Sequence, residues 1–239
     1  MISLALDTAT RTGSVALASD NTLVGWLDGD PERTHGERLP NDLLVCLAAH
    51  TITLADVDLF AVCTGPGSFT GLRVGLATMQ GLALAARRPL VGIPTLEALA
   101  HAGLEQGTTD DPALVIPWMD AQRGETFGAA YHVENSAVST EHQPAAAAPA
   151  ETLLKAWATM LQESRVLFVG DAVERTQTAI REIIGPDSML IPSMPPLAPT
   201  VALLAHARAA AAGAPHAIRP VYVRRPDAEL ARERRRSHR

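Results

Sequence analysis

Residues 57–86 read VDLFAVCTGPGSFTGLRVGLATMQGLALAA, and this segment decides the fold class. The apolar run at 57–63 is typical of a buried strand. The glycine-rich stretch 64–75 indicates a turn that leads into a long helix, which Pro89 ends because proline cannot continue a helix. A buried strand joined by a glycine-rich turn to a helix indicates an α/β protein.

The residues before this segment predict three strands and a helix. Apolar and polar residues alternate at 2–6, 14–19 and 22–27, which is the period of a half-buried strand. Short turns separate the three runs, so we expect a three-stranded meander. Thr34 is placed to cap a helix, and Glu37 three residues later completes a capping box.

The residues after the segment extend the pattern. Residues 90–93 predict a strand and Thr95 opens a helix, which gives the order three strands, helix, strand, helix, strand, helix. The polar, turn-rich residues 106–112 predict a domain boundary, beyond which the same order recurs with different residues. The Ala/Pro-rich stretch 143–150 is predicted to be a loop.

Two such copies facing one another across a cleft are the tandem actin-like (ASKHA, RNase H-like) arrangement of mixed-sheet domains. A shorter C-terminal unit and a basic tail, which we expect to be disordered, complete the chain. The predicted parts are an N-terminal domain at 1–105, a smaller second domain at 111–199, a C-terminal helix and strand at 200–225, and the tail at 226–239.

The composition is that of a folded protein. The 239 residues are 47% hydrophobic and 19% charged, which excludes a disordered chain, a collagen and a disulfide framework. Cys46 and Cys63 are expected to be reduced, buried thiols. No window reaches the roughly 18 to 20 apolar residues that a membrane span needs, and we expect a cytoplasmic protein.

The charge is unevenly distributed along the chain. The net charge is -6, but the last nine residues hold five arginines and one glutamate, so the tail carries +4 and the rest -10. An acidic body is not typical of a general nucleic-acid binder, because such affinity rests on neutralising phosphates, and any RNA contact is expected to be local. The tail fits either a solvated end or a phosphate-binding role.

The turns between the first two strands of each copy carry candidate cleft residues. An acidic residue at a strand end beside hydroxyl residues suits metal-bridged or backbone-donated phosphate contacts. A hairpin turn in which Asp and Thr bond their own backbone is the alternative. The candidates for a nucleotide or phosphate cleft are Asp7, Thr8, Thr10, Asp120 and Arg123.

The glycine-rich stretch has two interpretations. Gly65 and Gly67 suit a sharp turn that an anion can approach, but no Lys and Ser/Thr follow as in a Walker A loop, and the only lysine is Lys155. Alternatively, Gly71 and Gly75 share one helix face, against which either another subunit's helix or this domain's own sheet can pack closely.

The motifs in order resemble the bacterial TsaB (YeaZ) family. The matching stretches are LALDTAT at 4–10, HGERL at 35–39, TGPGSFTGLRVG at 64–75, GIPTLEALA at 92–100, MDAQRGETF at 119–127 and PVYVRRPDAE at 220–229. The resemblance implies the tandem actin-like fold and a non-catalytic partner of the TsaD subunit. That enzyme transfers a threonylcarbamoyl group to the adenosine beside the anticodon of tRNAs reading codons that begin with A.

The resemblance also implies what this chain lacks. The catalytic relative holds its metal with a His-x-x-x-His pair, and Thr95 and Leu99 occupy the matching positions, where neither is an adequate ligand. None of the eight histidines forms an i, i+4 pair elsewhere, and Ser68 lies outside a GxSxG elbow. We therefore expect no catalytic residue, no metal and no cofactor of its own, with ATP and a metal ion belonging to the partner subunits.

The leading interpretation is a scaffold that activates the TsaD subunit as a heterodimer, with the TsaE ATPase as a further partner and tRNA contacted indirectly. A homodimer is expected when the chain is alone, because a surface for a homologous subunit is nearly self-complementary. The alternative is a small ATP-dependent enzyme, kinase-like or nucleotidase-like, using the Asp7 cleft. The predicted dimer interface on the first two helices comprises His35, Leu39, Leu44, Gly71, Arg73, Gly75, Thr78 and Met79.

Overall fold

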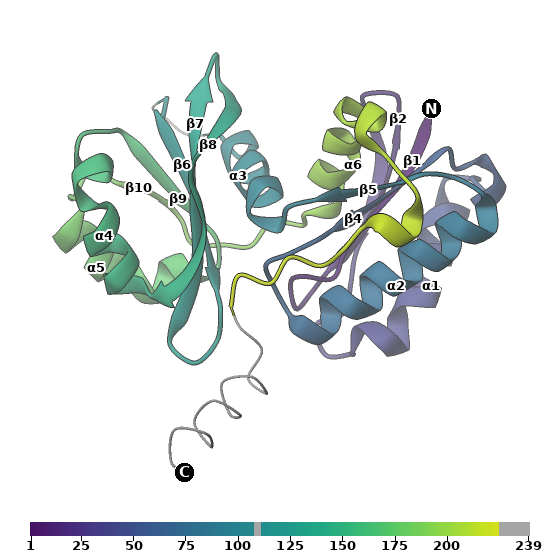
Figure 1. Ribbon diagram of the computed structural model, residues 1–239, viewed down its shortest axis with the longest axis horizontal. Coiled ribbons are helices and arrows are strands. Elements are labelled where there is room, and N and C mark those ends of the chain that lie inside the picture. Colours follow the sequence, from purple (N-terminus) through teal and green to yellow (C-terminus); the bar gives the residue numbers. More distant parts are fainter. Residues whose placement is uncertain (108–110, 225–239) are drawn as a thin grey trace, which may run out of the picture.

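The computed structural model describes residues 1–107 and 111–224. Two five-stranded mixed sheets form two lobes, with strand orders β3-β2-β1-β4-β5 and β10-β9-β6-β7-β8 (Figure 1). In each sheet the first three strands are antiparallel neighbours, and the other two continue the sheet in parallel beside the first. This repeated topology is the tandem actin-like fold that the sequence predicted.

The first lobe follows the predicted order. Its outer face is covered by two helices, and alternation along β1 divides the side chains: Leu4 and Leu6 pack toward these helices, whereas Ala5 faces the other lobe. The elements are β1 (Ile2–Asp7), β2 (Ser14–Ser19), β3 (Thr22–Asp28), α1 (His35–Ala49), η1 (Leu54–Asp56), β4 (Leu59–Cys63), α2 (Phe69–Ala86) and β5 (Leu90–Ile93).

The second lobe repeats this plan with one longer strand. Its outer face packs on α4 and α5 around Trp118, whose ring meets Phe168 edge-on at 5.6 Å. The elements are β6 (Leu114–Asp120), β7 (Glu125–Glu134), β8 (Ala137–Pro149), α4 (Ala150–Gln162), β9 (Val166–Val169), α5 (Ala172–Ile183) and β10 (Met189–Ile191).

The loop predicted at 143–150 is wrong, because strand β8 runs to Pro149 and pairs with β7. Prolines are tolerated there since β8 is an edge strand, where a missing N–H need not break a ladder. Its alanines also alternate: Ala146 and Ala148 pack on the outer side and Ala147 on the inner side. The composition suggested a loop only because small residues hide the period of two.

Each of the two helices between the sheets packs on the sheet that is formed by the other half of the sequence. Helix α3 (Thr95–Glu105) follows the first sheet but packs on β6, β7 and β8, whereas α6 (Ala198–Ala207) packs on β1, β2 and β4 (Figure 1). The boundary predicted after residue 105 therefore separates α3 from the sheet that it covers. One hydrophobic cluster runs through both helices into both sheets, so the lobes share a core.

Of the helix and strand predicted at 200–225, the helix is present as α6, but the described residues up to Arg224 form no strand. After α6 come two short 3-10 turns, η2 (Ala209–Ala211) and η3 (Pro215–Ala217), and then an extended segment to Arg224 that crosses toward the second lobe (Figure 1). This segment forms no strand; it is tied to the first sheet by the Leu90–Gly213 bridge and by Val221 N, which donates to Thr64 O at 2.7 Å. The tail predicted at 226–239 lies outside the described residues.

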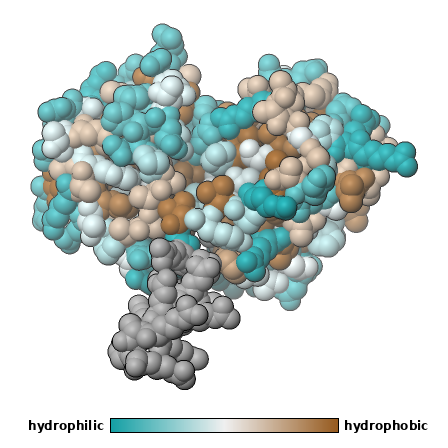
Figure 2. All heavy atoms as spheres, in the orientation of Figure 1, coloured by the Kyte–Doolittle hydropathy of each residue, from teal (hydrophilic) through white to brown (hydrophobic). Residues whose placement is uncertain are grey.

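The surface is mixed in character. Hydrophobic residues, drawn in brown, are scattered over both lobes among hydrophilic ones on the face shown in Figure 2. Within residues 1–107 and 111–224, no helix has the length and apolar character needed to cross a membrane.

Candidate functional site

A cleft of about 1110 Å³ lies between the lobes. Six segments line it: the β1–β2 loop, the residues before α1, the first turns of α2, the β6–β7 hairpin, the turn between β9 and α5, and the C-terminal segment. Polar, charged and aromatic side chains of the lining include Thr10, Arg11, Arg33, His35, Phe69, Asp120, Asp171, Tyr222 and Arg224.

The predicted candidates on the β1–β2 loop divide between cleft and core. Asp7 and Thr8 are each 1% exposed and do not line the cleft, whereas Thr10 does. The Asp7 carboxylate accepts bonds from Ala9 N at 2.8 Å and from the Thr10 hydroxyl at 2.5 Å, and burial raises its pKa. This is the geometry of the alternative interpretation, a turn whose Asp bonds its own backbone and side chains.

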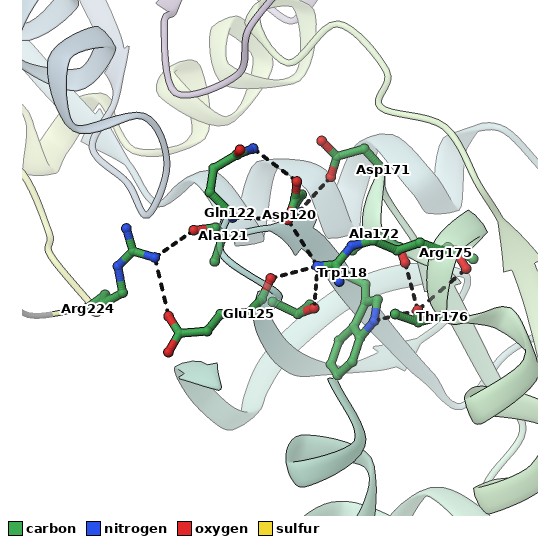
Figure 3. A network of polar contacts seen from close by, with 12 residues as sticks. Trp118, Asp120, Ala121, Gln122, Glu125, Asp171, Ala172, Arg175, Thr176 and Arg224 are labelled. Carbon is green, nitrogen blue, oxygen red and sulfur yellow. Dashed lines mark hydrogen bonds and ion pairs between the residues drawn. The ribbon is translucent and has the colours of Figure 1, made fainter. Parts of the chain in front are cut away.

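The matching loop of the second lobe is built around two carboxylates that face the cleft (Figure 3). Asp120 accepts bonds from Gln122 N at 3.0 Å and from the Arg175 guanidinium at 3.0 Å. Asp171 accepts from Asp120 N at 2.8 Å, and burial raises the pKa of Asp171. Arg123, the other predicted candidate, is exposed and has a left-handed φ of 57°.

Arg175 fixes this loop, and the sequence did not identify it. Its guanidinium also donates to Glu125 O at 2.6 Å and to Thr126 Oγ1 at 3.0 Å, so one side chain holds both ends of the turn (Figure 3). Asp171 was missed as well, although it directly follows strand β9 and Gly170 and immediately precedes α5. Such an acidic residue between a strand and a helix was the available signal.

The glycine-rich loop receives the protein's own chain. A Cβ on Gly65, whose φ is +114°, would lie 2.5 Å from Val221 O, and one on Gly67 would lie 2.6 Å from Ala9 O. These two glycines are therefore required for the close approach of neighbouring backbone. Ser68 caps α2 by accepting from Gly71 N at 3.2 Å.

The predicted interface residues do not share one surface. Gly71 and Gly75 face the β1–β2 loop, since their missing Cβ atoms would lie 2.1 Å and 2.0 Å from atoms of Thr8. Packing within the domain thus accounts for both glycines, and they offer no surface to another subunit. Leu39 and Met79 are also buried, His35 and Thr78 are half-buried, and Leu44 and Arg73 are exposed.

The outward surface of the same two helices is apolar. Leu44, Val45 and Leu84 are 61%, 45% and 68% exposed. The sequence did not single out Val45 of α1 or Leu84 of α2. Helix α2 is apolar on most sides, so its buried side cannot be read from periodicity. We define the α1–α2 face by its exposed small and apolar residues, which are Leu44, Val45, Ala48, Ala77, Gly81 and Leu84.

The positions matched to the relative's metal ligands lie in the core. Thr95 is fully buried, and its hydroxyl accepts from Gly65 N at 3.0 Å. Leu99 belongs to the hydrophobic cluster between the lobes. Neither residue lines the cleft. Within the described residues, no group of three or more His, Cys, Asp or Glu side chains is placed to hold a metal ion.

Arg38, a buried arginine of α1, links this helix to the β1–β2 loop beside the cleft. Arg38 is 3% exposed, pairs with Asp42, and donates to Thr12 O and to His35 Nδ1. Since arginine can only donate, His35 Nδ1 accepts and its Nε2 carries the proton that reaches Thr10 O at 3.0 Å. Burial and the Arg38 charge lower the pKa of His35.

A family model described as TsaD: tRNA N6-adenosine threonylcarbamoyltransferase matches residues 30–232. The chain belongs to this family. The tRNA threonylcarbamoyladenosine biosynthesis protein TsaB of Escherichia coli (strain K12) is 37% identical over 136 residues, which are 56% of this chain and 57% of the relative. The protein of the same name from Bacillus subtilis (strain 168) is 27% identical over 188 residues, 77% of each chain.

Solved structures agree with these relatives. YeaZ from Pseudomonas aeruginosa is 25% identical and superposes with a TM-score of 0.74 over 92% of this chain and 99% of that one. The TsaB (YeaZ) resemblance of the sequence motifs is thus confirmed. The first curated relatives are matched over little more than half their own length.

Proposed function

We propose that the chain acts in the biosynthesis of threonylcarbamoyladenosine in tRNA as a non-catalytic scaffold that activates a TsaD-type transferase. The names of its TsaB relatives support a part in this biosynthesis. The modified residue is then the adenosine beside the anticodon of tRNAs that read codons beginning with A. A TsaE-type ATPase is the further partner, and tRNA is contacted through the complex.

The proposed pairing with the TsaD-type subunit rests on the α1–α2 face. Three large apolar side chains, Leu44, Val45 and Leu84, are exposed on two adjacent helices that form the outer layer of the first lobe. Exposed small residues of α2, such as Ala77 and Gly81, leave room for a partner's helices to approach. A homologous TsaD-type subunit is expected to offer two corresponding helices, since the TsaD family model matches this chain over residues 30–232, and a second copy of this chain offers the same two.

The buried positions support a non-catalytic role. Thr95 and Leu99 are engaged in the core, and a metal ion bound there would have neither an adequate ligand nor access to the cleft. ATP and the metal ion belong to the partner subunits in this proposal. Asp7, the residue on which an ATP-dependent enzyme would depend, is buried and bonded within its own loop. The scaffold therefore takes precedence over that enzyme.

An omission series tests this function. Purified TsaD-type and TsaE-type subunits, supplied with ATP and an activated threonylcarbamoyl donor, are assayed for transfer of this group to tRNA with this chain present, absent or supplied alone. We expect product only when the chain and the TsaD-type subunit are both present. Product without the chain, or from the chain alone, contradicts the proposal.

A matched pair of variants separates pairing from folding. Leu84→Glu places a charge on the α1–α2 face. When this chain is the limiting component, we expect the substitution to lower product formation at least about tenfold, because the complex would bury an unpaired charge, which is costly. Val24→Glu places the same charge on an exposed position of β3 and should leave product formation close to that of the wild type. Equal effects of the two substitutions would contradict the assignment of the face.

A further inference from the structure

Three arginines at or beside the mouth of the cleft form no ion pair within the described residues, although Arg33 has a longer-range electrostatic interaction with Glu37. Within the described residues, Arg11, Arg33 and Arg73 have no carboxylate oxygen within ion-pair distance, whereas Arg175 and Arg224 are paired. Across residues 1–107 and 111–224, the hydrogen bonds of the Arg11 and Arg33 guanidinium groups go to backbone oxygens, each at 3.3 Å. Three arginines, Arg11, Arg33 and Arg224, and three carboxylates, Glu32, Asp120 and Asp171, line the cleft, so the guanidinium groups of Arg11 and Arg33 are local positive sites and not a net excess of charge.

An aromatic pair lies on the wall of the same cleft. The rings of Phe69 and Tyr222 are 5.1 Å apart and inclined at 33°, and they remain 42% and 38% exposed. The Arg73 guanidinium lies 3.9 Å above the Phe69 ring and donates to the Tyr222 hydroxyl at 2.9 Å. Tyr222 is held in place because Val221 N donates to Thr64 O.

These groups together match the two parts of a nucleotide in RNA. Guanidinium groups that form no ion pair attract phosphates, and exposed, positioned aromatic rings stack unpaired bases. We propose that the cleft mouth binds unpaired nucleotides of RNA directly, with a base stacked on the Phe69–Tyr222 pair and the backbone phosphates at Arg11 and Arg33. The choice of RNA as ligand rests on the proposed function, but direct contact goes beyond the scaffold role.

The arrangement favours an extended strand over a free nucleoside triphosphate. The three arginines come from three separate segments: the β1–β2 loop, the residues before α1, and α2. The glycine-rich loop is filled by Val221 and Ala9 of the chain itself, so it offers no cradle for a triphosphate. Local charges spaced along a groove beside a stacking surface are typical of single-strand recognition.

Fluorescence anisotropy of the full chain with a fluorescein-labelled, ten-nucleotide single-stranded RNA tests the proposal. We expect saturable binding that weakens with salt and is stronger than for the same RNA in a duplex. Tyr222→Leu should weaken binding about five- to hundredfold, the range measured for losing one base–aromatic stack. Tyr222→Phe, which keeps the ring and loses the bond to Arg73, should stay within about threefold of the wild type.

Two further variants make the result specific. Replacing Arg11 and Arg33 together by Gln should flatten the dependence of log K on log salt by about 0.7 for each phosphate that is no longer neutralised. Trp26→Leu removes an aromatic side chain that is 52% exposed on β3, away from the cleft, and should bind as the wild type does. Circular dichroism and melting of each variant verify that it is folded.

Each other outcome overturns the proposal. If the RNA shows no saturable binding at low salt, the proposal is contradicted directly. Wild-type affinity of Tyr222→Leu would place the RNA elsewhere on the chain, such as its basic tail. Displacement of the RNA by an equimolar amount of ATP would identify a free nucleotide as the ligand. If RNA binding fails while product still requires the chain in the omission series, this inference falls and the scaffold function stands.

Discussion

The missing Cβ of Gly75 would lie 2.0 Å from Thr8 Oγ1, so helix α2 rests directly on the β1–β2 loop. The Thr8 hydroxyl donates to Gly71 O at 2.8 Å, one turn earlier on the same helix. Gly71, Gly75 and Thr8 therefore form one contact. Because the two glycines have no side chains, the loop packs directly against the backbone of α2.

Gly75→Ala should destabilise the protein. The added methyl group overlaps a buried hydroxyl, and overpacking of this kind costs about 1–3 kcal/mol. Gly81→Ala is the matched control, because a Cβ there meets nothing within 4 Å and helix propensity favours alanine by about 0.5–1 kcal/mol. Urea unfolding of both variants measures the difference. A Gly75→Ala variant as stable as the wild type would contradict the contact.

Replacing His35 should remove part of the pH dependence of stability. The folded protein holds His35 neutral, since burial and Arg38 lower its pKa. The unfolded chain binds this proton near its ordinary pKa of about 6.5, so stability is lost as the pH falls below that value. We expect the free energy of unfolding to fall less between about pH 7 and about pH 5 in His35→Gln than in the wild type.

The control for this experiment is a histidine on the surface. His216 is exposed, and His216→Gln controls for the replacement of a histidine by glutamine as such. His101, whose pKa burial also lowers, is retained in every variant and contributes equally to each curve. A His35→Gln curve parallel to that of the wild type would show that His35 is not held neutral.

The organisation of the fold was largely predictable, because it rests on local patterns. The alternation at 2–6 and 14–19 and the capping box at Thr34 each depend on neighbours in sequence, and the structure has the corresponding strands and helix. The exchange of α3 and α6 between the sheets was not predictable, since periodicity shows that a helix has an apolar side but not which sheet covers it.

The site was predicted less well for a related reason. Motif spacing placed Asp7 and Asp120 at equivalent turns, yet only Asp120 lines the cleft. The Asp7 carboxylate is turned inward by bonds to Ala9 and Thr10 that any Asp-containing turn can form. Arg175 reaches the β6–β7 loop, and Tyr222 reaches the cleft, from segments far away in the sequence, and periodicity does not show such long-range contacts.

Removal of Arg175 should loosen the β6–β7 loop without unfolding the protein. Arg175→Gln cannot hold the Asp120 carboxylate and the Glu125 carbonyl at once, so we expect faster amide hydrogen exchange at residues 121–125. The side chain is 37% exposed, so we expect only a modest loss of global stability. Exchange rates in this loop that match the wild type would contradict the role of Arg175.

Both thiols should be unreactive in the folded protein. Cys46 and Cys63 are 3% and 1% exposed, and burial raises the pKa of Cys46 to about 11 and that of Cys63 well above its usual value. Little thiolate is then present at about pH 8. Iodoacetamide should label neither residue until denaturant is added, as measured by mass spectrometry. Rapid labelling of the native protein would contradict their burial.

The affinity of this chain for a purified TsaD-type subunit is the most direct test of the central claim. Isothermal titration with the wild type, Leu84→Glu and Val24→Glu compares the α1–α2 face with a control surface on β3. We predict a one-to-one complex that Leu84→Glu weakens at least about tenfold and that Val24→Glu leaves unchanged. Failure of the wild type to bind, or equal binding by all three proteins, would contradict the claim that this face is where the scaffold meets its enzyme.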